Sequence, residues 1–418
     1  MPSGLRIVTE EVSTSRSAAV GIWANVGSRD ESKSVAGASH FLEHLLFKGT
    51  KRRTALEISS SIEAVGGEMN AFTGQEYTCF YARVIDTDLE LAVDVVTDLI
   101  TSSTFTSEDV DSERKVVLSE IAVRDDDPSD YIHELYLDTV YGDSPIGRSI
   151  LGTVDSITKM PRNSIFNYYK KHYQPENLVV SVAGNVKHKK VVKLVEEALS
   201  RDNFLDTPTK SHHTRVATPV KTPGLGKVGL IDRKTEQAHI LYGFPGLARN
   251  DERRFALSVL SSAVGGGMAS RLFQEIREKR GLAYTTYSYP QQFAGTGTLA
   301  FYAGCKVEKA EEVIKLMRDI SESVAQHGLT SEEISRAKGA VTGGLILGQE
   351  DTGSRMSRIG KSELVYGEIM SFDEILAKVR SVTPEQVHQL ARDLFTAPAT
   401  LALVGPFRSK AKFEKVIS

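Results

Sequence analysis

The chain repeats its own pattern at an offset of about 220 residues, and this repeat limits the possible folds more than any other feature. An apolar run at 18–23 leads into a glycine turn, and a similar run at 238–244 does the same. The tripeptide at 80–82 returns at 301–303 as Phe-Tyr-Ala. Because the matches keep one order and a nearly constant spacing, the sequence predicts a duplicated domain.

Each copy mixes strand-like alternation with long helical periods. In the first copy these patterns predict strands at 5–9, 17–26, 68–72, 78–84 and 178–183, and helices at 37–47, 54–65, 88–101, 107–124, 131–140 and 162–172. We therefore expect an α+β protein with two duplicated α/β sandwich domains, each a mainly antiparallel sheet with helices covering one face. The predicted domains are 1–205 and 227–418, joined by a Pro-, Ser- and Thr-containing linker at 206–226.

Composition narrows the class of protein. The 418 residues suit two domains, and 40% hydrophobic with 25% charged residues is typical of a globular chain. A net charge of −3 argues against a nucleic-acid partner. No apolar run is long enough to span a membrane, and the first ten residues do not resemble a secretory signal. Cys79 and Cys305 are expected to be reduced thiols, so we expect a cytoplasmic protein.

The most informative motif for function is His40-Phe41-Leu42-Glu43-His44. A helix advances about 100° per residue, so His40, Glu43 and His44 lie on one face. Two imidazoles one turn apart can bind one metal ion, and the carboxylate between them can reach a water molecule on that ion. A chance pair of histidines on an amphipathic helix is the alternative. The motif favours a metal-dependent hydrolase.

A catalytic zinc site generally has three protein ligands, so this motif needs a third. Glu120 is the best candidate, and it lies on the predicted helix 107–124 that also carries Glu113. The two glutamates are two helical turns apart and share a face. One could bind the metal while the other hydrogen-bonds a ligating histidine.

The segment 35–50, around the motif, resembles the signature of the inverted-motif (HxxEH) zinc metallopeptidases, the family of pitrilysin, insulin-degrading enzyme and mitochondrial processing peptidase. The resemblance continues through 66–78, the Glu113 and Glu120 pair, and 270–284, and so covers nearly the whole chain. Length and layout are most similar to the two-domain bacterial processing-peptidase-like subfamily.

The resemblance implies a role for each matching residue. It implies that His40, His44 and Glu120 hold one Zn²⁺ per chain, with Glu43 as general base and Glu113 behind a ligand. It further implies that Asn70 and Ala71 contact a peptide substrate, that Phe72 lines a side-chain pocket, and that Arg277 and Tyr284 stabilise the oxyanion.

The second copy lacks its own ligands, since the positions equivalent to His40 read Leu260-Ser261-Ser262. The resemblance implies a chamber enclosed by four such domains, so we expect a homodimer or a heterodimer with a related subunit. Arg277 and Tyr284 of one chain would then complete the site of the other, and the chamber would favour unfolded peptides. A non-catalytic structural or peptide-binding subunit, and a presequence-processing enzyme, remain alternatives.

Overall fold

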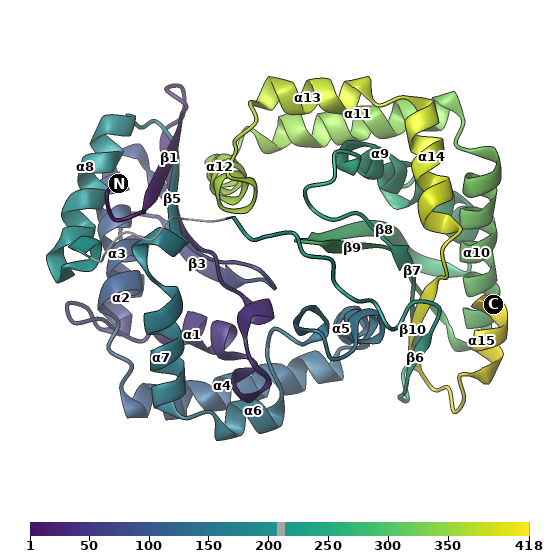
Figure 1. Ribbon diagram of the computed structural model, residues 1–418, viewed down its shortest axis with the longest axis horizontal. Coiled ribbons are helices and arrows are strands. Elements are labelled where there is room, and N and C mark those ends of the chain that lie inside the picture. Colours follow the sequence, from purple (N-terminus) through teal and green to yellow (C-terminus); the bar gives the residue numbers. More distant parts are fainter. Residues whose placement is uncertain (207–213, 418) are drawn as a thin grey trace. The chain divides into compact units, whose positions relative to one another are not determined.

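The computed structural model describes residues 1–206 and 214–417 (Figure 1). The chain forms two compact units, and each is assembled from three separate stretches of sequence. The first unit contains 1–122, 149–215 and 347–370, and the second contains 123–148, 216–346 and 371–418. None of the helices in the described ranges is both long and apolar enough to cross a membrane.

The first unit is a five-stranded sheet with the strand order β1-β5-β2-β4-β3. Among the described strands of this sheet, β1 and β5 pair in parallel and the other neighbours pair antiparallel, with β3 at one edge. Its strands are β1 (Arg6–Glu11), β2 (Ser17–Ala24), β3 (Glu68–Thr73), β4 (Thr78–Ile85) and β5 (Leu178–Gly184). Its helices are α1 (Ala38–Leu46), α2 (Ala55–Glu63), α3 (Leu89–Ser102), α4 (Ser107–Asp126, which continues into the second unit), α6 (Val154–Lys159), α7 (Arg162–His172), α8 (His188–Leu199) and α12 (Thr352–Tyr366).

The second unit repeats this sheet with the order β6-β10-β7-β9-β8, in which β8 is an edge strand. Its strands are β6 (Val228–Asp232), β7 (Gln237–Pro245), β8 (Ala283–Phe293), β9 (Thr296–Lys306) and β10 (Thr400–Gly405). Its helices are α5 (Pro128–Tyr141), α9 (Arg254–Gly265), a π-helix (Phe273–Glu278), α10 (Ala310–His327), α11 (Ser331–Gly348, which continues into the first unit), α13 (Phe372–Ser381), α14 (Pro384–Phe395) and α15 (Ala411–Ile417).

Strand β2 shows how the sequence builds the first unit. Its side chains alternate between two buried clusters, because successive residues of a strand point to opposite faces. Val20 and Ile22 pack with the helices α1 and α3, whereas Ala19 and Trp23 pack with Met356 of α12. A strand buried on both faces reads as a continuous apolar run, as β2 does.

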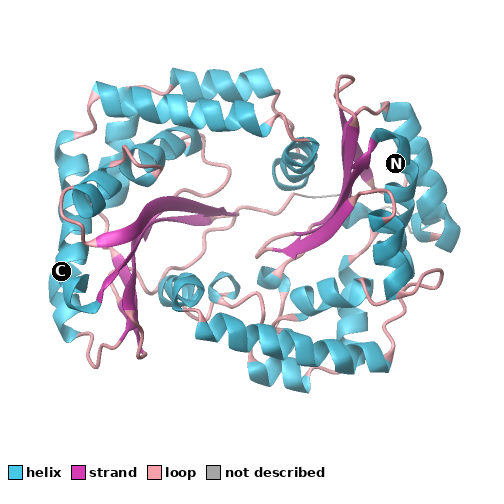
Figure 2. Ribbon diagram, turned by 180° about the vertical axis from the view of Figure 1, so that it is seen from behind, coloured by secondary structure: helices cyan, strands magenta, loops and turns pink. Residues whose placement is uncertain are grey.

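The predicted fold class is confirmed, with one correction: each sheet has helices on both faces (Figure 2). The second face of the first sheet is covered by α12, and that of the second sheet by α5. Each of these helices comes from the other half of the sequence. Amphipathic periodicity predicts that a helix buries one face but does not identify the sheet that it covers. The sequence therefore did not predict that α5 and α12 each cover a sheet formed mainly by the other half of the chain.

The predicted domain boundaries remain a prediction. The chain changes unit at 215–216, inside the predicted linker 206–226, of which residues 207–213 lie outside the described part of the chain. The predicted domains 1–205 and 227–418 do not include the exchange of α5 and α12 between the compact units.

Candidate metal centre

Helix α1 carries the HxxEH motif, and the loop before it sets its start. Gly37 has φ +91°, and a Cβ there would lie 2.7 Å from the carbonyl oxygen of Leu151, so glycine is needed on both counts. The buried carboxylate of Glu31 accepts hydrogen bonds from the backbone N–H groups of Gly37 and Ser39, each at 2.7 Å. An acid at this position also interacts favourably with the helix dipole.

The structure brings the three predicted ligands together. The Oε2 atom of Glu120 lies 3.5 Å from Nε2 of His40 and 3.4 Å from Nε2 of His44. One ligand atom from each residue falls within 4.8 Å of the others. Two imidazole nitrogens and one carboxylate oxygen are a common donor set for catalytic zinc, and a fourth position would remain for water. Ligation itself stays a prediction.

The surroundings of His40 fit a metal ligand. Burial, assisted by the nearby His44, lowers the pKa of His40 to about 4, so the ring is neutral near pH 7. Neutral imidazole is the form that binds metal ions. Glu120 is 40% exposed, so the cluster is open to solvent on that side.

Glu113 connects His44 to Lys48. Its side chain is only 5% exposed, and its Oε2 lies 3.1 Å from Nδ1 of His44 while its Oε1 lies 2.5 Å from Nζ of Lys48. A carboxylate can only accept from a ring nitrogen, so Nδ1 carries the proton and Nε2 keeps its lone pair. The contact between Glu113 and His44 agrees with the predicted placement of Glu113 behind a ligating histidine, and its role there stays a prediction.

Glu43 lies on the same helix as the two histidines. Thr73 Oγ1, at the end of β3, donates a 2.5 Å hydrogen bond to Glu43 Oε2. Burial raises the pKa of Glu43, while the bond from Thr73 opposes that rise. One carboxylate oxygen is thereby fixed to the edge strand.

The predicted substrate residues lie on that edge strand. Asn70 and Phe72 point to one face of β3, and Ala71 points to the other. The backbone N–H of Ala71 donates to Oδ1 of Asn70 at 2.8 Å. Phe72 is 40% exposed and packs edge-to-face against Trp23, with 5.7 Å between the ring centroids. These three residues lie on a strand at the edge of the sheet, and their contact with substrate stays a prediction.

Arg277 and Tyr284 lie together in the second unit. Arg277 belongs to the π-helix and its guanidinium stacks 4.5 Å from the ring centroid of Tyr284, while Nη1 donates to the Tyr284 carbonyl oxygen at 3.1 Å. Tyr284 is the second residue of β8 and is 75% exposed, so the ring is available to a ligand. Their role at the oxyanion stays a prediction.

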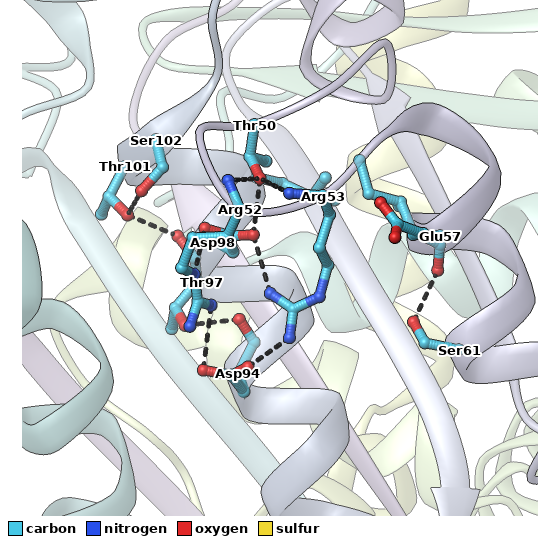
Figure 3. Close-up of polar contacts among 12 residues, drawn as sticks. Thr50, Arg52, Arg53, Glu57, Ser61, Asp94, Thr97, Asp98, Thr101 and Ser102 are labelled. Atoms are coloured by element: carbon cyan, nitrogen blue, oxygen red, sulfur yellow. Dashed lines mark hydrogen bonds and ion pairs between the residues drawn. The ribbon is translucent and has the colours of Figure 1, made fainter.

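The loop after α1 is fixed to α3 by charged side chains (Figure 3). Arg52 and Arg53 both reach Asp94 and Asp98, and Thr50 Oγ1 donates to Asp98 at 2.8 Å. Asp98 is buried, so these bonds satisfy a carboxylate that would otherwise be costly. This network fixes residues 50–53, which follow the helix that carries His40 and His44, to α3.

Three residues that contact the start of α1, Glu113 or Glu43 were not predicted from the sequence. Glu31 precedes α1, Lys48 follows His44 by one helical turn, and Thr73 shares a strand face with Ala71. The spacing of Lys48 and the strand parity of Thr73 are signals in the sequence, although neither identifies the long-range partner.

Comparisons with known proteins agree with this fold and identify a class of zinc peptidases. The description "Insulinase (Peptidase family M16)" matches residues 6–154, and "Peptidase M16 inactive domain" matches 159–341. The chain belongs to peptidase family M16.

Its relatives include chains named uncharacterized zinc proteases. One from Streptomyces coelicolor is 54% identical, with 98% of this chain and 89% of that protein covered. Another, from Bacillus subtilis, is 39% identical, with 97% of each covered. The crystal structure of a protease from Helicobacter pylori has a TM-score of 0.89 at 23% identity, covering 97% of both chains. A structure from Pseudomonas fluorescens, described as a peptidase M16 inactive domain, has a TM-score of 0.88 at 18% identity and the same coverage. These two structures support the fold alone.

Proposed function

We propose that this chain is a zinc-dependent endopeptidase that cleaves unfolded peptides or oligopeptides. The observation that carries the proposal is the convergence of donor atoms from His40, His44 and Glu120 within 4.8 Å, with Glu43 on the same helix. The family and the names of its relatives support the coarser conclusion of a zinc protease.

Bound zinc would supply a Lewis acid that lowers the pKa of a water molecule and polarises the peptide carbonyl. In the proposed reaction, Glu43 removes a proton from the attacking water as a C–O bond forms. The peptide C–N bond then breaks, and Glu43 delivers that proton to the leaving nitrogen. Thr73 orients one oxygen of Glu43, which leaves the other oxygen for the proton.

The proposed substrate is an extended peptide that adds to β3. An edge strand offers unpaired backbone groups, and main-chain hydrogen bonds tolerate many sequences. The side chain of Asn70 accepts the Ala71 N–H, so an incoming peptide carbonyl would have to replace Asn70 Oδ1 there. Aromatic packing around Phe72 would favour an apolar substrate side chain on that face.

The test of activity is cleavage of a quenched fluorescent peptide library by the purified chain, with chelator and with zinc returned. We expect cleavage that chelator abolishes and zinc restores, and that Glu43→Gln removes while zinc still binds. Stoichiometric zinc without any turnover in the unmutated chain would instead support the non-catalytic binding subunit. Comparing general peptides with basic presequence-like peptides in the library separates an oligopeptidase from a processing enzyme.

We also infer a dimer in which Arg277 and Tyr284 serve the partner's metal site. The test mixes two inactive variants, Glu43→Gln and Arg277→Ala. A mixed dimer would regain one complete site, so activity should return to about a quarter of the wild-type level when the chains assort randomly. No recovery in a mixture that does exchange chains would contradict the shared site. An unmixed Arg277→Ala sample with full activity would contradict the role of Arg277.

A further inference from the structure

Lys48 is the cation that completes a buried chain of contacts behind the metal cluster. Its Nζ lies 2.5 Å from Oε1 of Glu113, and the other oxygen of Glu113 lies 3.1 Å from Nδ1 of His44. Within residues 1–206 and 214–417, no other lysine or arginine lies within 4 Å of the Glu113 carboxylate. The single ammonium therefore balances a carboxylate that is 5% exposed.

We propose that Lys48 is a positioning residue for the metal site: it fixes Glu113 so that this carboxylate holds His44 with Nε2 directed at the metal. The inference rests on the proposed function, since it takes His44 to be a zinc ligand. Among the described residues, each carboxylate oxygen of Glu113 has one polar partner. Removing Lys48 would free Oε1 and let the carboxylate rotate about its terminal torsion, which is broad in glutamate.

The geometry of α1 explains why Lys48 can reach Glu113. Lys48 follows His44 by four residues, and its backbone N–H donates to the Leu45 carbonyl, so it continues the last turn of the helix. The side chain is 35% exposed, so its ammonium keeps contact with solvent while it contacts the buried acid. The loop that follows is held by the Arg52 and Arg53 network, which limits where Lys48 can move (Figure 3).

A purely structural role is the competing explanation, because a lysine at a helix C-terminus also interacts favourably with the helix dipole. The two roles differ in what they predict. A dipole effect would change the stability of the protein without zinc and leave zinc affinity in the folded protein unchanged. A positioning role changes zinc affinity and depends on Glu113.

The experiment measures zinc affinity of the full chain by competition with a chromophoric chelator, which needs no turnover. We expect Lys48→Met to weaken zinc binding about 10- to 100-fold, as loss of a residue behind a metal ligand generally does. Lys48→Arg should restore most of the affinity. The matched control is Lys51→Met, three residues along the same loop, which should bind zinc as the wild type does.

A double-mutant cycle separates positioning from a general loss of structure. If Lys48 acts through Glu113, then Glu113→Gln combined with Lys48→Met should weaken binding no more than about twofold beyond Glu113→Gln alone. Additive losses would overturn the inference. Unchanged affinity in Lys48→Met, while His44→Ala abolishes binding, would overturn it and leave the proposed function intact. Wild-type protein that binds no zinc would overturn both.

Discussion

The hydrogen bond from Thr73 to Glu43 yields a quantitative prediction about catalysis. Thr73→Val removes the hydroxyl and keeps the shape of the side chain, so Glu43 Oε2 loses its 2.5 Å partner. Hydrogen bonds to charged groups contribute about 1.5–3 kcal/mol. If the bond acts by orienting the base in the transition state, that energy lowers kcat by about 10- to 150-fold, at about 1.4 kcal/mol per factor of ten.

The assay is steady-state cleavage of one fluorescent peptide, with zinc content measured on the same samples. We expect kcat to fall while KM and zinc content remain close to the wild-type values, and we expect Thr73→Ser to recover most of the activity. Thr101→Val is the matched control, because that hydroxyl donates to the Thr97 carbonyl on α3, away from Glu43. A Thr73→Val enzyme with wild-type kcat would refute the reasoning, as would a serine variant that is as impaired as valine.

Two further predictions concern stability. Burial raises the pKa of Glu333, but the bonds from Arg271 and Thr330 outweigh this and hold it at about 2. The bonds to the carboxylate therefore stabilise the fold above the usual glutamate pKa and are lost as pH falls toward 2. Glu333→Gln should lower the free energy of unfolding by about 1–2 kcal/mol at pH 7, a range that allows for solvent screening. The loss should be much smaller at pH 3, and urea unfolding at the two pH values measures it. A cost that does not change with pH would contradict this. Gly360→Ala places a Cβ 2.2 Å from Nε1 of Trp23 and should destabilise the protein by about 1–3 kcal/mol in the same assay. Gly339→Ala on α11 meets nothing within 4 Å and should stabilise it by about 0.5–1 kcal/mol; equal effects of the two changes would argue against a tight α12 contact.

The parts of the site that are local in sequence were predictable. His40, Glu43 and His44 share one helix, so the 3.6-residue period alone places them on one face. Glu113 and Glu120 share α4, and their relative placement follows from the same period. That α4 approaches α1 could not be derived from periodicity; the resemblance to a known family supplied that step. The structure then brings Glu120 to both histidines.

The positioning residues were missed because their partners are distant in sequence. Thirty residues separate Thr73 from Glu43, and 65 separate Lys48 from Glu113. Strand parity predicts that Thr73 shares a face with Ala71, and Ala71 packs against the core that includes α1. It does not predict which polar group on α1 the hydroxyl meets, since that depends on how the helix sits on the sheet.

Helix α12 is a second case in which the sequence did not identify a contact partner that is distant in the chain. It also contacts residues near the candidate site. Gly360 and Gly21 allow α12 to lie directly on the sheet, where a Cβ on Gly21 would be 2.4 Å from Met356 Sδ. Arg355 and Arg358 of α12 both pair with Glu10 of β1.

The helix packs against Trp23, and the Trp23 ring packs against Phe72 on the edge strand. The residue expected to line a substrate pocket is therefore supported by a helix from the other half of the sequence. We infer that α12 belongs to the catalytic unit, and that a fragment ending at residue 205 would lack part of the wall behind Phe72.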